Sequence, residues 1–402
     1  MSASRLSNAL RHGVGAMGKD DMFLNDQDVI ELVGWRRKLH SQPEISGEES
    51  VTAREVQEFL SRSSPDQILP DIGGHGVAVV YNGNAPGPTV MFRAELDALP
   101  IEEVTDVPYR SQVTGRGHLC GHDGHMAILA ALGRGLGRNR PRSGRVVLMF
   151  QPAEENGAGA AAVIADPQFA QIAPDYAFAL HNVPGIPFGQ VELKEGLVNC
   201  ASRGMRIVLH GRTAHASMPE TGISPMLAVA RLMPTLTALG VGGIMSDDFA
   251  MATVTHASMG EPAFGIAPGK AEIWTTLRTM SDARMGQLLS RAESLVRQTA
   301  EEAELGYSIS FHDVFGHCAN DVAAVECLRR ALDAENVQHQ PGEPMRASED
   351  FGRFGSVSKS AMFFLGAGVD HPSLHNPDYD FPDDLIAAGA RVFMRTASNL
   401  LG

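Results

Sequence analysis

The order in which short apolar runs and longer amphipathic runs follow one another constrains this fold most. In much of the chain, apolar runs of about six residues alternate with longer runs in which apolar residues recur every three or four positions. Short runs are typical of buried strands, and longer ones of the helices that cover them. We predict strands at 76–81, 89–94, 145–151, 176–181 and 361–366, and helices at 29–40, 48–62, 124–136, 321–335 and 383–400.

This rhythm changes between residues 199 and 312. There the predicted elements run strand, helix, strand, strand, helix and strand, at 205–210, 224–239, 250–258, 271–277, 281–304 and 307–312. The order βαββαβ is the ferredoxin-like pattern. A self-contained unit inside a longer chain is typical of an inserted domain. We therefore predict an α/β protein of two domains. One has a mixed sheet and comprises 1–198 and 313–402, with a loose extension to about residue 25, and the inserted domain is 199–312.

The composition narrows the class of protein. The chain has 402 residues, 44% hydrophobic and 20% charged, which is ordinary for a globular protein. Its net charge of −14 argues against binding to a nucleic-acid backbone. No run approaches 18 apolar residues, so no membrane span is expected, and the first 25 residues lack the apolar run of a secretory signal. The four cysteines form no disulfide framework, and we expect a cytoplasmic protein.

Polar side chains gather where the predicted strands end. Residues 95–97, 154–155, 181–182 and 371–375 each follow a strand and supply Asp, Glu or His, and residues 117–125 hold three histidines with one cysteine. In open α/β sheets, ligands bind beyond the carboxyl ends of the strands. Imidazole, carboxylate and thiolate are the ligands of hydrolytic metals. The pattern therefore predicts a metal site at this edge of the sheet.

Hydrolysis at such a site needs a base beside the metal ligands. A pair of metals needs a bridging ligand and about five or six protein donors, with one position left for water. The adjacent residues Glu154 and Glu155 could divide the work, because one carboxylate can bind metal while its neighbour faces the substrate.

Eight segments carry a family resemblance: WRRKLHSQPEISGEE, RAELDALP, GHLCGHDGHMA, FQPAEENGAGA, HNVPGIPFG, GRTAHASMP, SEDFG and SLHNPDYDFPDD. In their order the chain resembles the M20 family of metallopeptidases over about residues 29–400. Its motifs are most similar to the M20D amidohydrolases, which include aminoacylases, hippurate hydrolases and auxin-conjugate hydrolases. The resemblance implies a catalytic domain with two divalent metals and a smaller lid domain used for dimerisation. A homodimer or a dimer-based oligomer is therefore expected.

The resemblance also implies roles for single residues. The positions that match metal ligands are Cys120, His122, Glu155, His181 and His375. Among these, Cys120 would be the bridging thiolate, and we expect zinc, with manganese and cobalt as alternatives.

Other matched positions lie around these ligands. Glu154 matches the general base, and Asp97 and His125 are expected to support the ligands from behind. His215, in the lid, matches a histidine that reaches the partner subunit's active site and polarises the scissile carbonyl. Arg278 is a candidate for binding the substrate carboxylate.

Three segments depart from the family pattern. Glu95 stands where the family usually has Asp, which places the same carboxylate one methylene further out. Gly265 stands where the family has an Asn that would help to bind the substrate carboxylate or the oxyanion. Thr275-Thr276-Leu277-Arg278 stands where the family has GTVR, and Arg278 is kept. The absence of the Asn affects substrate recognition and leaves the metal ligands unchanged.

The expected reaction is metal-dependent hydrolysis of an N-acyl-L-amino acid to a carboxylic acid and an amino acid. A carboxypeptidase or dipeptidase of the same family is the alternative with the same chemistry. A thiol amidase would instead use Cys120 as nucleophile and His122 as base, and it would survive metal removal. A non-catalytic metal-binding protein is a third class, and Glu154 argues against it because a storage site needs no base.

Overall fold

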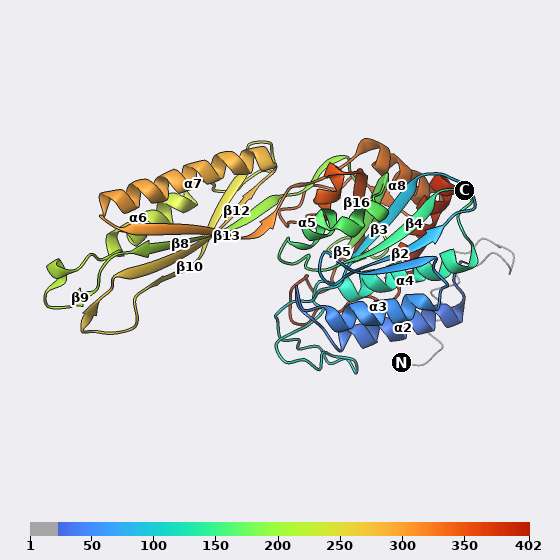
Figure 1. Ribbon diagram of the computed structural model, residues 1–402, viewed down its shortest axis with the longest axis horizontal. Coiled ribbons are helices and arrows are strands. Elements are labelled where there is room, and N and C mark those ends of the chain that lie inside the picture. Colours follow the sequence, from blue (N-terminus) through green and yellow to red (C-terminus); the bar gives the residue numbers. More distant parts are fainter. Residues whose placement is uncertain (1–22) are drawn as a thin grey trace.

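An eight-stranded mixed sheet forms the centre of the larger body in the computed structural model, which describes residues 23–402 (Figure 1). Its strand order is β1 (Gln67–Ile72), β2 (Gly76–Asn82), β4 (Arg145–Gln151), β3 (Thr89–Glu95), β5 (Tyr176–Pro184), β16 (Lys359–Gly368), β6 (Val191–Glu192) and β15 (His339–Gln340). The four central strands β4, β3, β5 and β16 are parallel, whereas β1, β2 and β6 join antiparallel neighbours. The parallel core brings several carboxyl ends to one edge.

Helices cover both faces of this sheet, which explains why its central strands are mostly apolar. One face packs on α2 (Asp26–His40), α3 (Ser50–Ser61), α4 (His122–Arg138), α8 (Val322–Ala334) and α9 (Leu385–Leu401). The other face packs on α5 (Gly159–Ala165) and the 3-10 helices η1 (Pro167–Gln171) and η3 (Asp350–Ser356). Along β3 the side chains alternate, so that Val90 and Phe92 enter the first core and Met91 the second.

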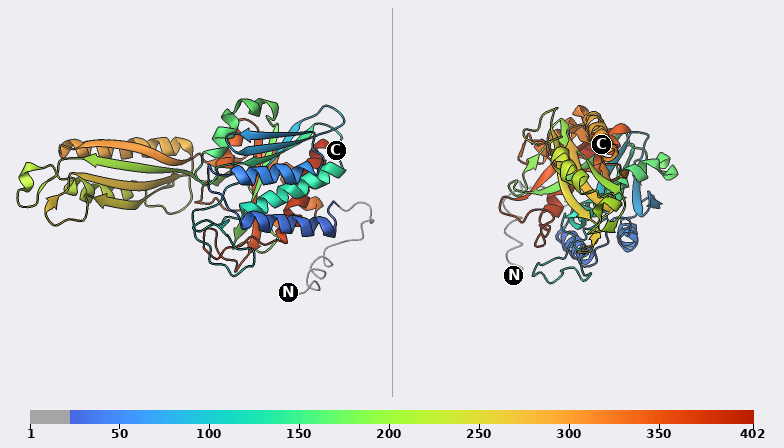
Figure 2. Two further views of the ribbon diagram at one scale, coloured as in Figure 1. Left: turned by 60° about the horizontal axis from the view of Figure 1, so that its bottom comes forward. Right: turned by 90° about the vertical axis from the view of Figure 1, so that its left-hand side faces the viewer.

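The smaller body is a four-stranded antiparallel sheet with two helices on one face (Figures 1 and 2). Its strand order is β10 (Ala250–Met259), β12 (Lys270–Thr279), β8 (Ala201–His210) and β13 (Gly306–Phe315). The helices α6 (Met226–Thr237) and α7 (Asp282–Glu302) cover Ile273 and Leu277 of β12, while the alternate residues Trp274 and Arg278 lie on the uncovered face. The short pair β9 (Ala214–His215) and β11 (Ile266–Ala267) lies at the far end of this body.

Several short or polar elements were not predicted from the sequence. They are β1, β6, β15, α5, the 3-10 helices η1, η2 (Pro219–Thr221) and η3, and the pair β7 (Gly196–Asn199) and β14 (Cys318–Asn320). Strand β1 has a mostly exposed sequence that includes Pro70, and it forms only because β2 offers an edge to pair with. The prediction that His181 follows its strand is wrong, because β16 pairs with β5 as far as Pro184. Residues 1–22 of the expected N-terminal extension lie outside the described residues.

No helix among residues 23–402 is both long enough and apolar enough to cross a lipid bilayer.

Helix α2 is tied to α4 by a buried carboxylate. Asp28 accepts hydrogen bonds from Arg138 at 2.6 and 2.7 Å and from Arg134 at 3.0 Å, and it completes a capping box with Asn25. Burial alone would raise the pKa of Asp28, but the two arginines and the Asn25 amide outweigh it and lower this pKa to about 2.

Replacing Asp28 with Asn is expected to lower the free energy of unfolding by about 1–2 kcal/mol near neutral pH, because a buried charge-assisted bond is lost. A depressed pKa stabilises the fold above the unfolded value of 3.8 and stops doing so as the pH falls toward 2. The difference between wild type and variant should therefore shrink over that interval. Urea unfolding at several pH values measures it, and a difference that stays constant down to the lowest pH would contradict the assignment.

Candidate active site

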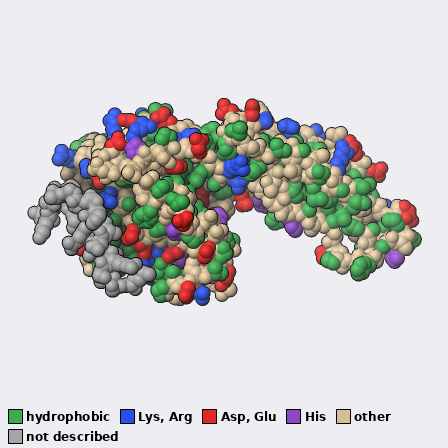
Figure 3. Space-filling model, turned by 180° about the vertical axis from the view of Figure 1, so that it is seen from behind, with side chains coloured by type: hydrophobic (Ala, Val, Ile, Leu, Met, Phe, Trp, Pro, Cys, Tyr) green, Lys and Arg blue, Asp and Glu red, His purple; other side chains and the backbone are tan. Residues whose placement is uncertain are grey.

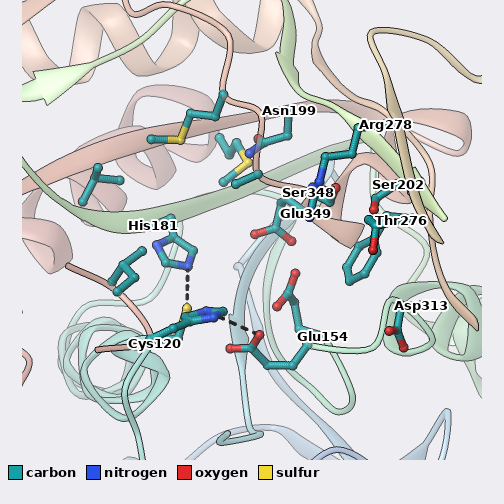
Figure 4. A pocket seen from close by; sticks show the side chains of 18 of the residues that line it. Cys120, Glu154, His181, Asn199, Ser202, Thr276, Arg278, Asp313, Ser348 and Glu349 are labelled. Carbon is teal, nitrogen blue, oxygen red and sulfur yellow. Dashed lines mark hydrogen bonds and ion pairs between the residues drawn. The ribbon is translucent and has the colours of Figure 1, made fainter. Parts of the chain in front are cut away.

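A cavity of about 330 Å³ lies between the carboxyl ends of β4 and β5 and the strands β8, β12 and β13 of the smaller body (Figure 4). Six residues singled out from the sequence line it: Cys120, Glu154, Glu155, His181, Arg278 and His375. They come from segments spread over some 250 positions of the chain, and the parallel strands bring them to one edge.

The turn before α4 places two of the histidines. Gly121 has a φ of +88°, and a Cβ there would lie 2.3 Å from the Asn182 side-chain oxygen, so only glycine fits without a shift. The helix then begins at His122, two residues earlier than predicted. His122 and His125 are therefore not loop residues but lie one turn apart on the same helix face.

The His122 ring is oriented so that its second nitrogen faces Glu155. Its Nδ1–H donates to the Asp97 carbonyl oxygen at 2.9 Å, so Nε2 is the ring nitrogen that could bind a cation once its proton is displaced. That nitrogen lies 3.9 Å from Glu155 Oε1, and both atoms are buried without a hydrogen-bond partner among the described residues. The other Glu155 oxygen, Oε2, lies 3.7 Å from His375 Nε2.

His181 directs its second ring nitrogen toward the sulfur of Cys120. Its Nδ1–H donates to the Asn182 carbonyl oxygen at 2.8 Å, and its Nε2 lies 3.5 Å from Cys120 Sγ (Figure 4). Ligand atoms of Cys120, His122 and His181 lie within 4.8 Å of one another, and so do those of Cys120, Glu155 and His375. The two triplets share Cys120.

These donors fit divalent cations. Buried polar atoms without partners are costly, and the facing atoms of His122 and Glu155 would both be satisfied by one cation between them. In both His122 and His181, the nitrogen that faces away from the other candidate ligands is fixed by a backbone carbonyl, the arrangement found for histidines that bind metal. The overlap of two triplets at a cysteine provides for two neighbouring cations.

Burial and the neighbouring charges shift the pKa values of these candidate ligands in different directions. Burial, reinforced by Glu155 and Glu154, raises the pKa of the Cys120 thiol well above its usual value. Burial lowers the pKa of His181 to about 3, so this ring is neutral. Burial opposes a charge on His122 as well, but Asp97 and other nearby carboxylates raise its pKa to about 10. A cation at this point would displace these protons.

Glu154 lies on the other side of the cavity from Cys120 (Figure 4). Its carboxylate belongs to a buried cluster with Glu349 and Asp350, whose oxygens lie within 4.8 Å of one another. Burial, together with the charges of Glu349, Glu155 and Asp350, raises the pKa of Glu154 well above its usual value. Such a carboxyl group can hold a proton near neutral pH.

Asp97 and His125 lie behind the cavity wall. Asp97 is buried and accepts hydrogen bonds from the Ser46 hydroxyl at 2.7 Å and from the Glu155 amide at 3.0 Å. His125 contacts Glu95 Oε2 at 2.7 Å and Asn182 Oδ1 at 2.6 Å, so both of its nitrogens are occupied. Neither residue lines the cavity.

The residues that sequence reasoning missed form one buried charge cluster. Arg93, in the middle of β3, has no exposed side-chain surface and donates hydrogen bonds to Glu349, Asp350 and Gln151 and to Glu95. An arginine inside an otherwise apolar strand needs buried acidic partners, so Arg93 itself is the feature of the sequence that indicates such a cluster. The segment SEDFG, used above only for the resemblance, supplies Glu349 and Asp350.

The two candidate residues of the smaller body are placed differently. Arg278 lines the cavity and donates hydrogen bonds to the Arg346 carbonyl oxygen at 2.8 Å and the Ser348 hydroxyl at 2.9 Å. His215 is exposed at the far end of the smaller body, where its Nδ1 contacts Ser217 Oγ at 2.7 Å, and it does not line the cavity of its own chain. Gly265 is its neighbour, since the Gly265 carbonyl accepts a hydrogen bond from the Ala216 amide.

A known protein family and several known proteins match this chain over most of its length. Residues 91–399 match the family Peptidase family M20/M25/M40. The chain is 32% identical over 372 residues to the N-acetyl-L-cysteine deacetylase of Bacillus subtilis, covering 92% of this chain and 88% of the relative. It is 30% identical over 382 residues to the hippurate hydrolase of Campylobacter jejuni, covering 93% and 98%.

A solved structure shares the fold over almost the whole chain. It is a Bacillus subtilis protein described as a dinuclear metal binding peptidase from the M20 family, with a TM-score of 0.78 and 24% identity, covering 94% of this chain and 99% of that one. The two-body mixed α/β architecture is therefore the one found in M20 structures. Together with the family match over residues 91–399, this establishes that the chain belongs to peptidase family M20/M25/M40.

Proposed function

We propose that this protein is a metal-dependent amidohydrolase that cleaves N-acyl-L-amino acids to a carboxylic acid and an amino acid. The observation that carries the proposal is the cavity in which a buried donor set lies opposite Glu154 and near Arg278. The names of the two curated relatives, both hydrolases of N-acylated amino acids, support this substrate class.

Five residues would hold two divalent cations: Cys120, His122, Glu155, His181 and His375. Cys120 belongs to both ligand triplets, which supports its role as the shared ligand. We propose zinc, with manganese and cobalt as alternatives. The bound cations would lower the pKa of a water molecule and polarise the amide carbonyl.

Glu154 would move the proton. Its raised pKa, caused first by burial, suits a group that accepts a proton from the attacking water and passes it to the leaving nitrogen. Arg278 would bind the substrate's carboxylate through guanidinium nitrogens that are not used by Arg346 and Ser348. Asp97 would hold His122 and the Glu155 backbone in place, and His125 would hold Asn182.

A thiol amidase fits this site less well. The Cys120 thiol is buried, and Glu155 and Glu154 raise its pKa further, so a thiolate is disfavoured without a bound cation. A nucleophilic cysteine needs the opposite environment.

We further propose that the smaller body, residues 199–312, is a ferredoxin-like lid inserted between catalytic segments 1–198 and 313–402, and that it forms a dimer. The strand order β10–β12–β8–β13 with both helices on one face supports the first point. Exposed apolar side chains support the second: Val241, Ile244, Phe264 and Ile266 are 57% exposed or more, and hydrophobic side chains lie on the smaller body's surface in Figure 3. Two of them flank Gly265 beside His215.

A hydrolysis screen tests the function. N-acetyl, N-benzoyl and long-chain N-acyl amino acids in L and D forms, together with dipeptides, are incubated with protein that has been stripped by a chelator and reloaded with Zn, Mn or Co. Metal-dependent release of free L-amino acid is expected. Preferential cleavage of dipeptides would favour the peptidase alternative, and activity that survives exhaustive chelation would favour a thiol enzyme.

Metal binding is expected to release protons and to strengthen as the pH rises. The raised pKa values of Cys120 and His122 keep both groups protonated near neutral pH in the metal-free protein, so a cation must displace these protons. Calorimetric titration with Zn²⁺ in buffers of different ionisation enthalpy counts the protons at each pH.

The control for this titration is Cys120→Ser, which should bind less metal, release fewer protons and lose activity in parallel. Zinc affinity that is independent of pH, or a Ser variant with full metal content, would contradict the ligand assignment.

A further inference from the structure

One carboxylate of the cavity has no role in the mechanism above. Glu349 is only 3% exposed, yet it lines the cavity, and its oxygens lie within 4.8 Å of those of Glu154. Figure 4 shows its carboxylate between the carboxylate of Glu154 and the Arg278–Ser348 pair. Since Ser348 precedes Glu349 in the chain and accepts the hydrogen bond of Arg278, these groups form one continuous wall.

The Glu349 carboxylate is held rigidly through one oxygen. Oε1 accepts hydrogen bonds from Arg93 Nη2 at 2.9 Å and from the Phe351 backbone amide at 2.9 Å. Both of these bonds are made by Oε1, and the other oxygen, Oε2, has no hydrogen-bond partner within residues 23–402. These two bonds fix the carboxylate and leave Oε2 able to accept a hydrogen bond from a molecule in the cavity.

The order of groups along this wall matches the order of atoms in an N-acyl amino acid. That substrate runs from the acyl carbonyl carbon to the amide nitrogen, then the α carbon and the carboxylate. If its carbonyl carbon lies beside Glu154 and its carboxylate binds Arg278, the amide nitrogen passes the group between them, which is Glu349.

We propose that Glu349 is a further catalytic residue, whose carboxylate accepts a hydrogen bond from the substrate's amide N–H and holds the nitrogen as it leaves. This inference rests on the proposed function. In the reaction, water gives its hydroxyl to the acyl carbon and a proton, through Glu154, to the nitrogen as the C–N bond breaks. The nitrogen becomes more positive in that step, so a carboxylate beside it stabilises the transition state more than the ground state.

The decisive comparison uses substrates with and without the N–H. N-acetyl-L-alanine is compared with O-acetyl-L-lactate, and hippurate with O-benzoylglycolate, in which an oxygen replaces the N–H. The ratio of kcat/KM for amide to ester within one variant cancels any general loss of activity. Compared between a variant and wild type, this ratio reports on the groups that act on the N–H and on the leaving nitrogen.

The variant is Glu349→Gln, which keeps the size of the side chain. Arg93 and the Phe351 amide both require an acceptor, so the glutamine oxygen takes their bonds and its NH₂ group points into the cavity. A donor then faces the substrate's own donor. The amide-to-ester ratio is expected to fall about ten- to a hundredfold, the usual effect of losing a hydrogen bond to a charged group.

The matched control is Asp350→Asn. Asp350 belongs to the same cluster and accepts a bond from Arg93 at 2.6 Å, but it does not line the cavity. Disturbing the cluster through Asp350 should lower amide and ester hydrolysis alike and leave their ratio unchanged. If Glu349→Gln does not fold, as judged by circular dichroism, Glu349→Asp withdraws the same acceptor by one methylene and is expected to lower the ratio in the same direction.

The outcomes separate this inference from the proposed function. Amides that are hydrolysed by wild type with a ratio that is unaffected by the Glu349 variants would overturn the role of Glu349 and leave the function standing. A wild-type enzyme that hydrolyses neither amide, after loading with Zn, Mn or Co, would contradict both. An equal fall for amide and ester would make Glu349 a positioning residue for Glu154 and would also overturn the proposal.

Discussion

The variant Glu154→Gln is expected to lower kcat by at least about 10²-fold while its metal content stays near that of wild type. The amide cannot accept the proton of the attacking water, and general acid–base catalysis contributes at least this much. The side chain keeps its size, and the proposed metal ligands are other residues, so the metals should remain bound. The measurement combines steady-state kinetics with metal analysis of the purified variant.

The adjacent residue provides the control. Glu155 lies near His122 and His375, whereas Glu154 lies near Glu349 and Asp350 as well as near His122 and Glu155. Glu155→Gln should therefore lose metal and activity together. If Glu154→Gln retains most of its activity, or loses its metal as Glu155→Gln does, the division of roles between these neighbours is wrong.

The variant His215→Ala is expected to lower kcat by about 10²–10³-fold with little change in metal content, the usual effect of removing one oxyanion donor. Within one chain His215 is exposed at the end of the smaller body and lines no part of the cavity. A catalytic effect of this size would therefore require that His215 enters the cavity of a partner subunit. The exposed Phe264 and Ile266 beside it are the surface that such a contact would cover.

Subunit mixing tests the contact across the dimer. Inactive Glu154→Gln and inactive His215→Ala are mixed under conditions in which subunits exchange, which a mass-tagged copy verifies. A mixed dimer holds one site with both residues intact, so part of the activity should return. Verified exchange without any recovery would mean that His215 acts in its own chain or has no catalytic role.

The site is built both from short motifs and from segments that are distant in the sequence. The residues Cys120 and His122 stand in one short motif, and Glu154 and Glu155 in another, so their chemistry is visible in the sequence. Their mutual arrangement depends on Gly121, whose left-handed conformation starts α4 at His122 and brings the loop against Asn182. That contact joins segments 61 positions apart and has no local signal.

Local patterns in the sequence predict the alternation of strands and helices, the change of rhythm at 199–312 and the candidate ligand residues, because each of these signals lies within a short segment. Long-range pairing and packing determine that β1 forms, that β5 runs on past His181, and that Arg93 meets Glu349 and Asp350 from more than 250 positions away. The tertiary structure also places His215 far from the cavity of its own chain. A strand edge needs a partner strand, and a buried charge needs an opposite charge. Either can come from any distant segment that packs nearby, and the packing depends on the whole fold.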